Sequence, residues 1–242
     1  MSDRPRVVVV LNSERSGPGR LLDWLAEEEV DADLVAGADL PEQSAAGSAA
    51  VDGLVLLGGA MMPNDDERAP FLRHERALVG EALVELVPVL GICLGAQLLA
   101  VVAGGEVTAE SGETERGSCS VDLLAAAGDD PLFGGLTDYN ELRMIQNHHD
   151  SITTLPPDAV HLATSGQCRV QAFRVGPVAW GVQFHPEASA ARLAEWDENK
   201  LAAEGFDRAT LLAEATADAP VSTQQARALI GAFADVVREA CR

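Results

Sequence analysis

The segment Val89-Leu-Gly-Ile-Cys-Leu-Gly-Ala-Gln97 places a cysteine between two glycines. A short apolar run precedes Cys93 and an apolar helical stretch follows it, so we expect Cys93 at a sharp strand-to-helix turn. Glycines two residues before and after suit such a turn, because side chains there would collide. The turn exposes its central side chain at a sheet edge, and the helix N-terminus favours a thiolate. The pattern predicts a nucleophilic cysteine, although taken alone it also fits a buried cysteine beside packing glycines.

The segment Trp180-Gly-Val-Gln-Phe-His-Pro-Glu187 offers a proton carrier. Its apolar run delivers His185 to the end of a second strand, and Pro186 favours extended geometry at His185. Residues i and i+2 of an extended segment point the same way, so Glu187 can hold the imidazole through a hydrogen bond. Such a carboxylate fixes the tautomer and stabilises imidazolium. A strand-end histidine alone is more often structural, but together with Cys93 it predicts a nucleophile–base–orienter triad.

Two adjacent glycines in Leu57-Gly-Gly-Ala-Met61 follow another buried strand. In a parallel sheet this turn lies at the same edge as Cys93. The backbone N–H groups of Gly59 and Leu94 can then face a developing oxyanion. A simple tight turn is the alternative interpretation of these glycines.

The elements around these motifs alternate in the first half of the chain. We expect strands at 6–11, 53–57 and 89–92 and helices at 18–29, 69–87 and 94–103. This alternation predicts right-handed βαβ units and a mostly parallel sheet. The second half has strand candidates with few helices between them, which predicts an antiparallel extension of the sheet: 118–124, 142–145, 160–163, 169–175 and 178–184.

From residue 188 the chain is rich in Ala and Glu and is expected to be helical. An apolar stripe with helical spacing favours docking on the protein's own sheet over a partner interface: Ala226, Leu229, Ile230, Phe233 and Val237. The predicted fold class is three-layer α/β, with a flavodoxin-like, mostly parallel central sheet, helices on both faces, added antiparallel strands and a helical tail. Residues 1–242 are interpreted as a single domain with a core of about 6–187 and a helical extension over 188–242.

Composition limits the possible partners. The 242 residues contain 17 Lys+Arg against 38 Asp+Glu, a net charge of −21, with Lys200 as the only lysine. Such a surface repels phosphate backbones and anionic lipids, which predicts no nucleic-acid and no membrane partner. The apolar run after Arg6 is too short for a signal-peptide core. The four cysteines lack CxxC spacing, and a cytoplasmic location is therefore expected.

Three of these segments together resemble the class I (triad-type) glutamine amidotransferases, in particular stand-alone proteins similar to the glutaminase domain of GMP synthase: Gly91-Ile-Cys-Leu-Gly-Ala-Gln97, His185-Pro-Glu187 and the double glycine. The resemblance runs from about residue 6 to residue 187. It implies that Cys93 attacks the side-chain amide of L-glutamine and forms a γ-glutamyl thioester. It also implies that His185 carries protons, that Glu187 orients His185, and that Gly59 and Leu94 bind the oxyanion.

The same resemblance implies a set of substrate-binding residues: Gly58, Gln97, His148, His149 and Asp150. Two positions depart from the family pattern, because Ala60 stands where proline is common and His149 where glycine is common. A side chain at His149 could narrow the pocket or shift its preference to another γ-glutamyl compound. Adjacent histidines in a strand point to opposite faces, so no metal site is predicted, and no cofactor is expected.

The leading hypothesis is hydrolysis of glutamine to glutamate and ammonia. No segment matches a P-loop, so an ammonia-accepting synthetase subunit would act in trans. A first alternative keeps the triad but cleaves γ-glutamyl amides or conjugates, as a γ-glutamyl peptidase or hydrolase. A second alternative is a non-catalytic regulatory subunit, which the intact Cys93, His185 and Glu187 argue against.

Overall fold

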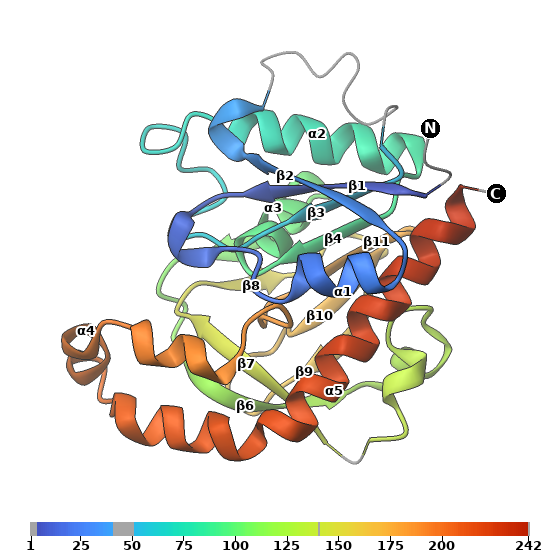
Figure 1. Ribbon diagram of the computed structural model, residues 1–242. Helices are drawn as coiled ribbons and strands as arrows, with labels where there is room; N and C mark the ends of the chain where they lie inside the picture. Colours follow the sequence, from blue (N-terminus) through green and yellow to red (C-terminus); the bar gives the residue numbers. More distant parts are fainter. Residues whose placement is uncertain (1–3, 41–50, 140, 242) are drawn as a thin grey trace.

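The computed structural model describes residues 4–40, 51–139 and 141–241. Its main feature is a nine-stranded sheet in the order β2-β1-β3-β4-β11-β10-β9-β6-β7 (Figure 1). The first five strands of that order pair in parallel: β2 (Asp31–Ala36), β1 (Arg6–Leu11), β3 (Gly53–Leu56), β4 (Val89–Ile92) and β11 (Ala179–Val182). This half of the sheet carries the strand ends that lead into the predicted motifs.

The other half of the sheet is antiparallel. It consists of β10 (Ala172–Val175), β9 (Val160–Thr164), β6 (Glu115–Leu123) and β7 (Leu142–His148). A separate two-stranded sheet pairs β5 (Glu106–Thr108) with β8 (Ser151–Thr154). The predicted antiparallel extension in the second half of the chain is therefore present.

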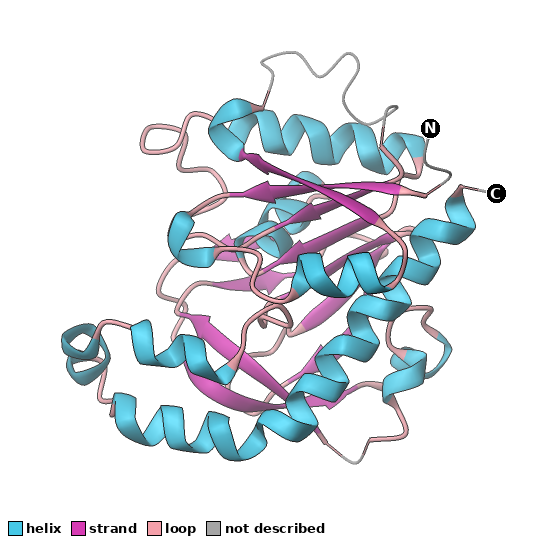
Figure 2. Cartoon of the chain, in the orientation of Figure 1, coloured by secondary structure: helices cyan, strands magenta, loops and turns pink. Residues whose placement is uncertain are grey.

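Helices cover both faces of the sheet (Figure 2). The helices are α1 (Leu21–Glu27), α2 (Leu72–Glu85), α3 (Leu94–Val102), α4 (Glu198–Ala203) and α5 (Arg208–Ala240). The shorter 3-10 segments are η1 (Glu14–Ser16), η2 (Gly37–Asp39), η4 (Ala125–Asp129), η5 (Gly134–Leu136) and η6 (Ala190–Glu195). α1 and α5 pack on one face of the parallel half, and α2 and α3 pack on the other.

Burial on both faces explains why these strands read as continuous apolar runs. In β1, Val7 and Val9 join the core under α1 and α5, whereas Val10 joins the core under α2 and α3. In β3, Val55 belongs to the core under α1 and α5, and Leu56 belongs to the core under α2 and α3. Side chains still alternate between faces, but both faces are apolar. The predicted α/β fold class is confirmed.

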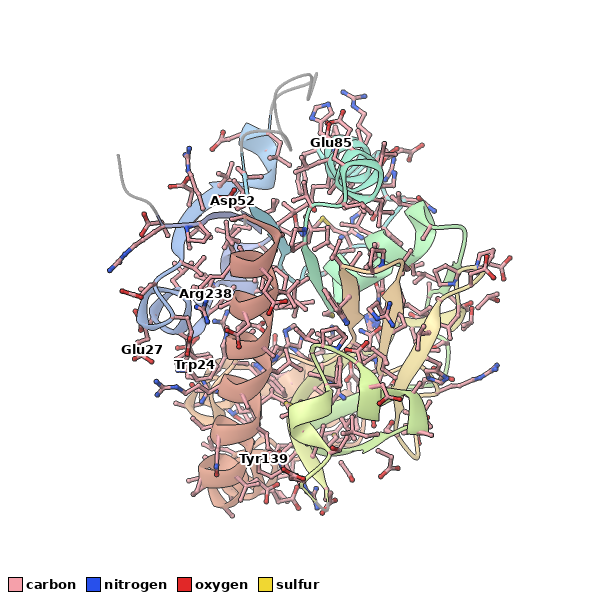
Figure 3. All side chains as sticks on the ribbon, turned by 90° about the vertical axis from the view of Figure 1, so that its right-hand side faces the viewer. Trp24, Glu27, Asp52, Glu85, Tyr139 and Arg238 are labelled. Atoms are coloured by element: carbon pink, nitrogen blue, oxygen red, sulfur yellow. The ribbon has the colours of Figure 1, made fainter. Side chains whose placement is uncertain are left out.

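The long helix α5 crosses one face of the sheet and lies beside α1 (Figure 3). All five residues of the predicted apolar stripe are at most 2% exposed and belong to the core between α5, α1 and the sheet. Docking of the stripe on the protein's own sheet is thereby confirmed. Among the helices described, none is long and apolar enough to cross a membrane.

Candidate active site

Cys93 occupies the turn between β4 and α3, with φ +53° and ψ −107°. A non-glycine residue with positive φ is strained and persists only where the surrounding structure imposes it. A Cβ on Gly91 would lie 2.5 Å from the Gly95 carbonyl oxygen, and one on Gly95 would lie 2.2 Å from the Leu56 carbonyl oxygen. Both contacts are with backbone, which cannot yield as a side chain does. The strand–turn–helix geometry predicted from the two glycines is present.

His185 and Glu187 follow β11, the neighbour of β4 in the sheet. The His185 N–H donates to the Ile145 carbonyl at 2.8 Å, which fixes the backbone against β7. His185 Nδ1 lies 2.7 Å from Glu187 Oε1, and both residues are buried. The predicted contact between the imidazole and the carboxylate is therefore made.

The His185 imidazole also interacts with Cys93. Burial by itself lowers the pKa of His185, but the charges of Glu187 and Cys93 and hydrogen bonds to both raise that pKa well above its ordinary value. A Cβ on Gly58 would lie 2.9 Å from His185 Cε1 and 3.6 Å from Cys93 Cβ. Cys93 and His185 therefore converge beside Gly58, and the environment favours the imidazolium.

Cys93 and His185 open into one pocket with most of the residues predicted to bind substrate. Its lining includes Gly59, Gln97, His148, His149 and Asp150. Gly58 lies outside this lining and packs against His185 instead. Leu94 begins α3, so its N–H lacks an acceptor within the helix. The Leu94 side chain lies next to Gly59, whose Cβ would be 2.7 Å from Leu94 Cδ2.

Hydrogen bonds hold the far wall of this pocket. Gln97 Nε2 donates to the Asp150 carbonyl at 3.2 Å. The Asp150 carboxylate accepts from the Glu110 N–H at 2.8 Å and lies 3.1 Å from His149 Nδ1. The His149 side chain is 42% exposed, so it borders the pocket without filling a buried space.

Several pocket residues were not predicted from the sequence. Ser16, Arg116, Asn147 and Lys200 line the same pocket as Cys93. Arg116 is 3% exposed and pairs with Glu204 at 2.8 Å, which ties β6 to the segment after α4. Lys200, the only lysine of the chain, arrives on α4. Its uniqueness was the one sequence signal that could have drawn attention to this segment.

A second buried cluster lies behind His148. Ligating atoms of Glu115, His148 and Cys168 lie within 4.8 Å of one another, and such donors can bind zinc. The Glu115 carboxylate already accepts hydrogen bonds from Ser165 and Gln171 and contacts His148 Nε2 at 3.2 Å. Burial and the neighbouring acidic groups raise the pKa of Cys168, which opposes the thiolate form that a metal requires. We interpret the cluster as a hydrogen-bonded network that fixes His148.

Comparison with known proteins places this architecture in a family. The model of the family "Glutamine amidotransferase class-I" matches residues 9–201. The chain belongs to the class I glutamine amidotransferases. A crystal structure of a glutamine amidotransferase from Thermotoga maritima superposes with a TM-score of 0.82 at 28% identity, covering 97% of this chain and all of that one.

Within the family, the chain is similar to one of the subunits of glutamine-hydrolysing GMP synthase. It is 37% identical over 139 residues to that subunit from Thermoplasma acidophilum, and the match covers 57% of this chain and 64% of the relative. It is 33% identical over 167 residues to the corresponding subunit from Haloquadratum walsbyi, covering 69% and 80%. The match with the Thermoplasma acidophilum and Haloarcula marismortui proteins spans 64% and 65% of their length, just under two thirds.

Proposed function

We propose that this protein hydrolyses the side-chain amide of L-glutamine through a thioester on Cys93. The observation that supports the proposal is the arrangement of three side chains at one sheet edge. Cys93 stands on a strained turn, His185 beside it carries a raised pKa, and Glu187 holds the far nitrogen of the imidazole at 2.7 Å. Membership of the class I glutamine amidotransferases supports the same reaction.

The proposed reaction has two stages. The Cys93 sulfur attacks the amide carbon, a C–S bond forms, and negative charge develops on the amide oxygen. The N–H groups of Gly59 and Leu94 would bind that oxygen. The His185 imidazolium gives its proton to the departing nitrogen, the C–N bond breaks, and ammonia leaves. Neutral His185 then takes a proton from water, which attacks the thioester and releases glutamate and the Cys93 thiolate.

The remaining pocket residues would bind the other end of glutamine. Gln97 and the backbone of residues 148–150 form one wall of the pocket, held together by the bond from Gln97 to Asp150. Such a wall suits the α-amino and α-carboxylate groups, because it offers both donors and acceptors. We propose that these residues fix the α-carbon and so place the side-chain amide at Cys93.

The ammonia is proposed to pass to another polypeptide. The similar proteins named above are subunits of glutamine-hydrolysing GMP synthase, and hydrolysis of glutamine releases the ammonia that a synthetase can use. No P-loop pattern occurs in the sequence. We therefore propose that the partner is an ammonia-accepting synthetase.

A glutamine-derived electrophile tests the site assignment. We expect a diazoketone analogue of glutamine to label the protein once, at Cys93, and Cys93→Ala to lose both labelling and glutaminase activity. Cys241→Ala is the matched control, because Cys241 is exposed at the end of α5. Peptide mass spectrometry locates the label. Labelling at Cys119 or Cys168 would contradict the assignment, and an unlabelled protein without turnover would favour the non-catalytic alternative.

One observation supports γ-glutamyl amides as a second candidate substrate class. Ser16 and Asn147 line the catalytic pocket and also two further spaces beside it. The first of these spaces is lined by His185, Glu187 and Trp196, and the second is lined by basic and acidic side chains. In the proposed reaction His185 protonates the leaving nitrogen. An amine larger than ammonia would therefore extend from His185 into these two spaces.

A panel of γ-glutamyl amides separates the two substrate classes. We expect glutamine to have the higher kcat/KM if the pocket serves amidotransfer. A preference for bulky amides by a factor of about one hundred, or about 2.7 kcal/mol in transition-state binding, would support the second candidate. Trp196→Ala should then lower kcat/KM for the bulky amides and leave glutamine hydrolysis unchanged.

A further inference from the structure

Glu75 is a fully buried carboxyl group that the proposed reaction does not use. It lies on α2, is 0% exposed, and neither of its oxygens has a hydrogen-bond partner in the described part of the chain. Burial raises the pKa of Glu75 to about 8, while the Asn12 amide and the Arg76 charge act in the opposite direction. An unpaired buried carboxylate is costly, and protonation removes the charge. Near neutral pH this side chain is mainly a carboxylic acid.

Asn12 connects Glu75 to the predicted oxyanion turn. Asn12 directly follows β1 and is 8% exposed. Its Nδ2 donates to the Leu57 carbonyl at 2.9 Å. A carbonyl oxygen can only accept, so this bond fixes which way the amide points. Asn12 Oδ1 is then the remaining acceptor, and it has no partner among the described residues.

The protonated acid and the amide are complementary. A carboxylate offers only acceptors, whereas a carboxylic acid offers one donor and one acceptor. Its O–H can donate to Asn12 Oδ1 while its carbonyl accepts the second N–H of Asn12. This pairing would satisfy all three oxygens that lack partners in the described structure. An ionised Glu75 offers no donor, so Asn12 Oδ1 stays without a partner among the described residues.

The bond from Asn12 reaches the chain next to the catalytic residues. Leu57 immediately precedes Gly58 and Gly59. A Cβ on Gly58 would touch His185, and one on Gly59 would lie 3.2 Å from Asn12 Cβ. We propose that Glu75, paired with Asn12, is a positioning residue that holds the Gly58–Gly59 turn beside Cys93. This inference rests on the proposed function, in which the Gly59 N–H binds the oxyanion.

Few other charged groups act on Glu75 in the described structure. Arg76, on the same helix, is engaged by Asp66 at 2.7 Å and by the Pro63 carbonyl at 2.6 Å. Asp39 is the one ionisable residue of η2, which packs on Glu75 through Gly37. α3, which packs against α2, contains no ionisable side chain. Protonation of Glu75 therefore follows mainly from its burial.

The experiment compares the wild type with Glu75→Gln. The glutamine amide can make the same two-point pair with Asn12 but stays neutral at every pH. The folded pKa of Glu75 lies above its unfolded value, so wild-type stability is lost as pH rises from about 4.5 to about 8. Denaturant unfolding should show this loss relative to Glu75→Gln. Above pH 8, the wild-type kcat for glutamine should fall about tenfold relative to Glu75→Gln, with KM unchanged, because displacing an oxyanion donor acts on the transition state.

Two further variants test the connection through Asn12. Glu75→Leu and Asn12→Ala should each lower kcat about tenfold at pH 7, and the double variant should lose no more than either single one. The proposed catalytic residues are the same in all variants, so the ratio of each kcat to that of Glu75→Gln isolates the effect of Glu75. The ratio of the wild-type kcat to the Glu75→Gln kcat could stay constant from about pH 6.5 to about pH 9.5, on both sides of the Glu75 pKa of about 8. That result would overturn the positioning role, and so would a Glu75→Leu variant with the kcat of the wild type. If neither the wild type nor Glu75→Gln hydrolyses glutamine, the proposed function fails, whereas the unfolding data still decide the protonation of Glu75.

Discussion

The contact between His185 and Glu187 sets the protonation state of the proposed acid. Burial alone would favour neutral imidazole, yet Glu187 and Cys93 reverse that effect and raise the pKa of His185. Glu187 is itself 3% exposed, and its second oxygen has no hydrogen-bond partner within the described chain. Its charge is therefore weakly screened and acts on the His185 imidazole and on the Arg20 guanidinium. In the proposed reaction, this balance would keep on His185 the proton that it gives to the departing amide nitrogen.

Glu187→Gln should lower the pKa of His185 and reduce kcat by about 10²- to 10⁴-fold, as expected for impaired acid–base catalysis. The alkaline limb of the kcat/KM profile should move to lower pH.

The pKa of His185 is raised above 6.5 in the fold, so the stability from the pair of His185 and Glu187 is complete below about pH 6.5 and is lost as pH rises through the folded value. The stability difference between wild type and variant should therefore shrink with rising pH. Glu239→Gln, an exposed change on α5, is the control; equal pH profiles for Glu187→Gln and the wild type would contradict the role.

At the scale of helices and strands, the elements with a strong local sequence pattern were predicted correctly. The strand 89–92 was predicted with the bounds that β4 has, and the helix after Cys93 ends at Val102, one residue before the expected limit. β2 was missed, because this edge strand is Asp31-Ala-Asp-Leu-Val-Ala36 and is only partly buried. An edge strand needs no continuous apolar run, and its polar residues read as a loop. Buried parallel strands are recognisable from sequence, whereas exposed edges depend on the neighbour they pair with.

The candidate site shows the same division between local and long-range features. Cys93, His185 and Glu187 were predicted from motifs that fix their own backbone geometry. Arg116 and Lys200 were not: Arg116 comes from β6, where it pairs with Glu204, and Lys200 comes from α4, in the chain after residue 188. Nothing in the local sequence of α4 specifies where that helix packs. The triad residues beside the pocket were therefore predictable from the sequence, whereas the pocket residue contributed by the segment after residue 188 was not.

The N-terminus of α1 gives another example of positioning by a distant element. The Arg20 N–H donates to the Glu187 carbonyl at 3.0 Å, and its guanidinium donates to the Ala188 carbonyl at 2.6 Å. The same guanidinium lies 4.5 Å from the centre of the Trp24 ring. Arg20 thus holds the segment that carries Glu187 from the opposite end of the sequence. Sequence reading found Glu187 but not this anchor.

At the scale of the whole molecule, α5 joins the two halves of the sheet. Near its middle, Gln225 donates to the Glu141 carbonyl at 2.7 Å and accepts from the Arg143 N–H at 2.8 Å, beside β7. Near its end, Val237 packs against Gly53 at the start of β3. The pocket takes Cys93 from the parallel half and residues 147–150 from the antiparallel half. We propose on this basis that residues 1–242 form one domain, in which the tail keeps the two walls of the pocket in register.

Phe233→Ala tests that proposal. Phe233 is fully buried on α5 within the core shared by α1 and the sheet. Its truncation should lower the free energy of unfolding by about 3–5 kcal/mol, through lost burial and the cavity left behind. Val221→Ala, on the same helix but 48% exposed, should change it by about 0.5 kcal/mol or less. In a single domain, circular dichroism and Trp fluorescence should report one coincident transition that moves as a unit. Two transitions, of which Phe233→Ala moves only one, would show instead that the tail and the core unfold separately.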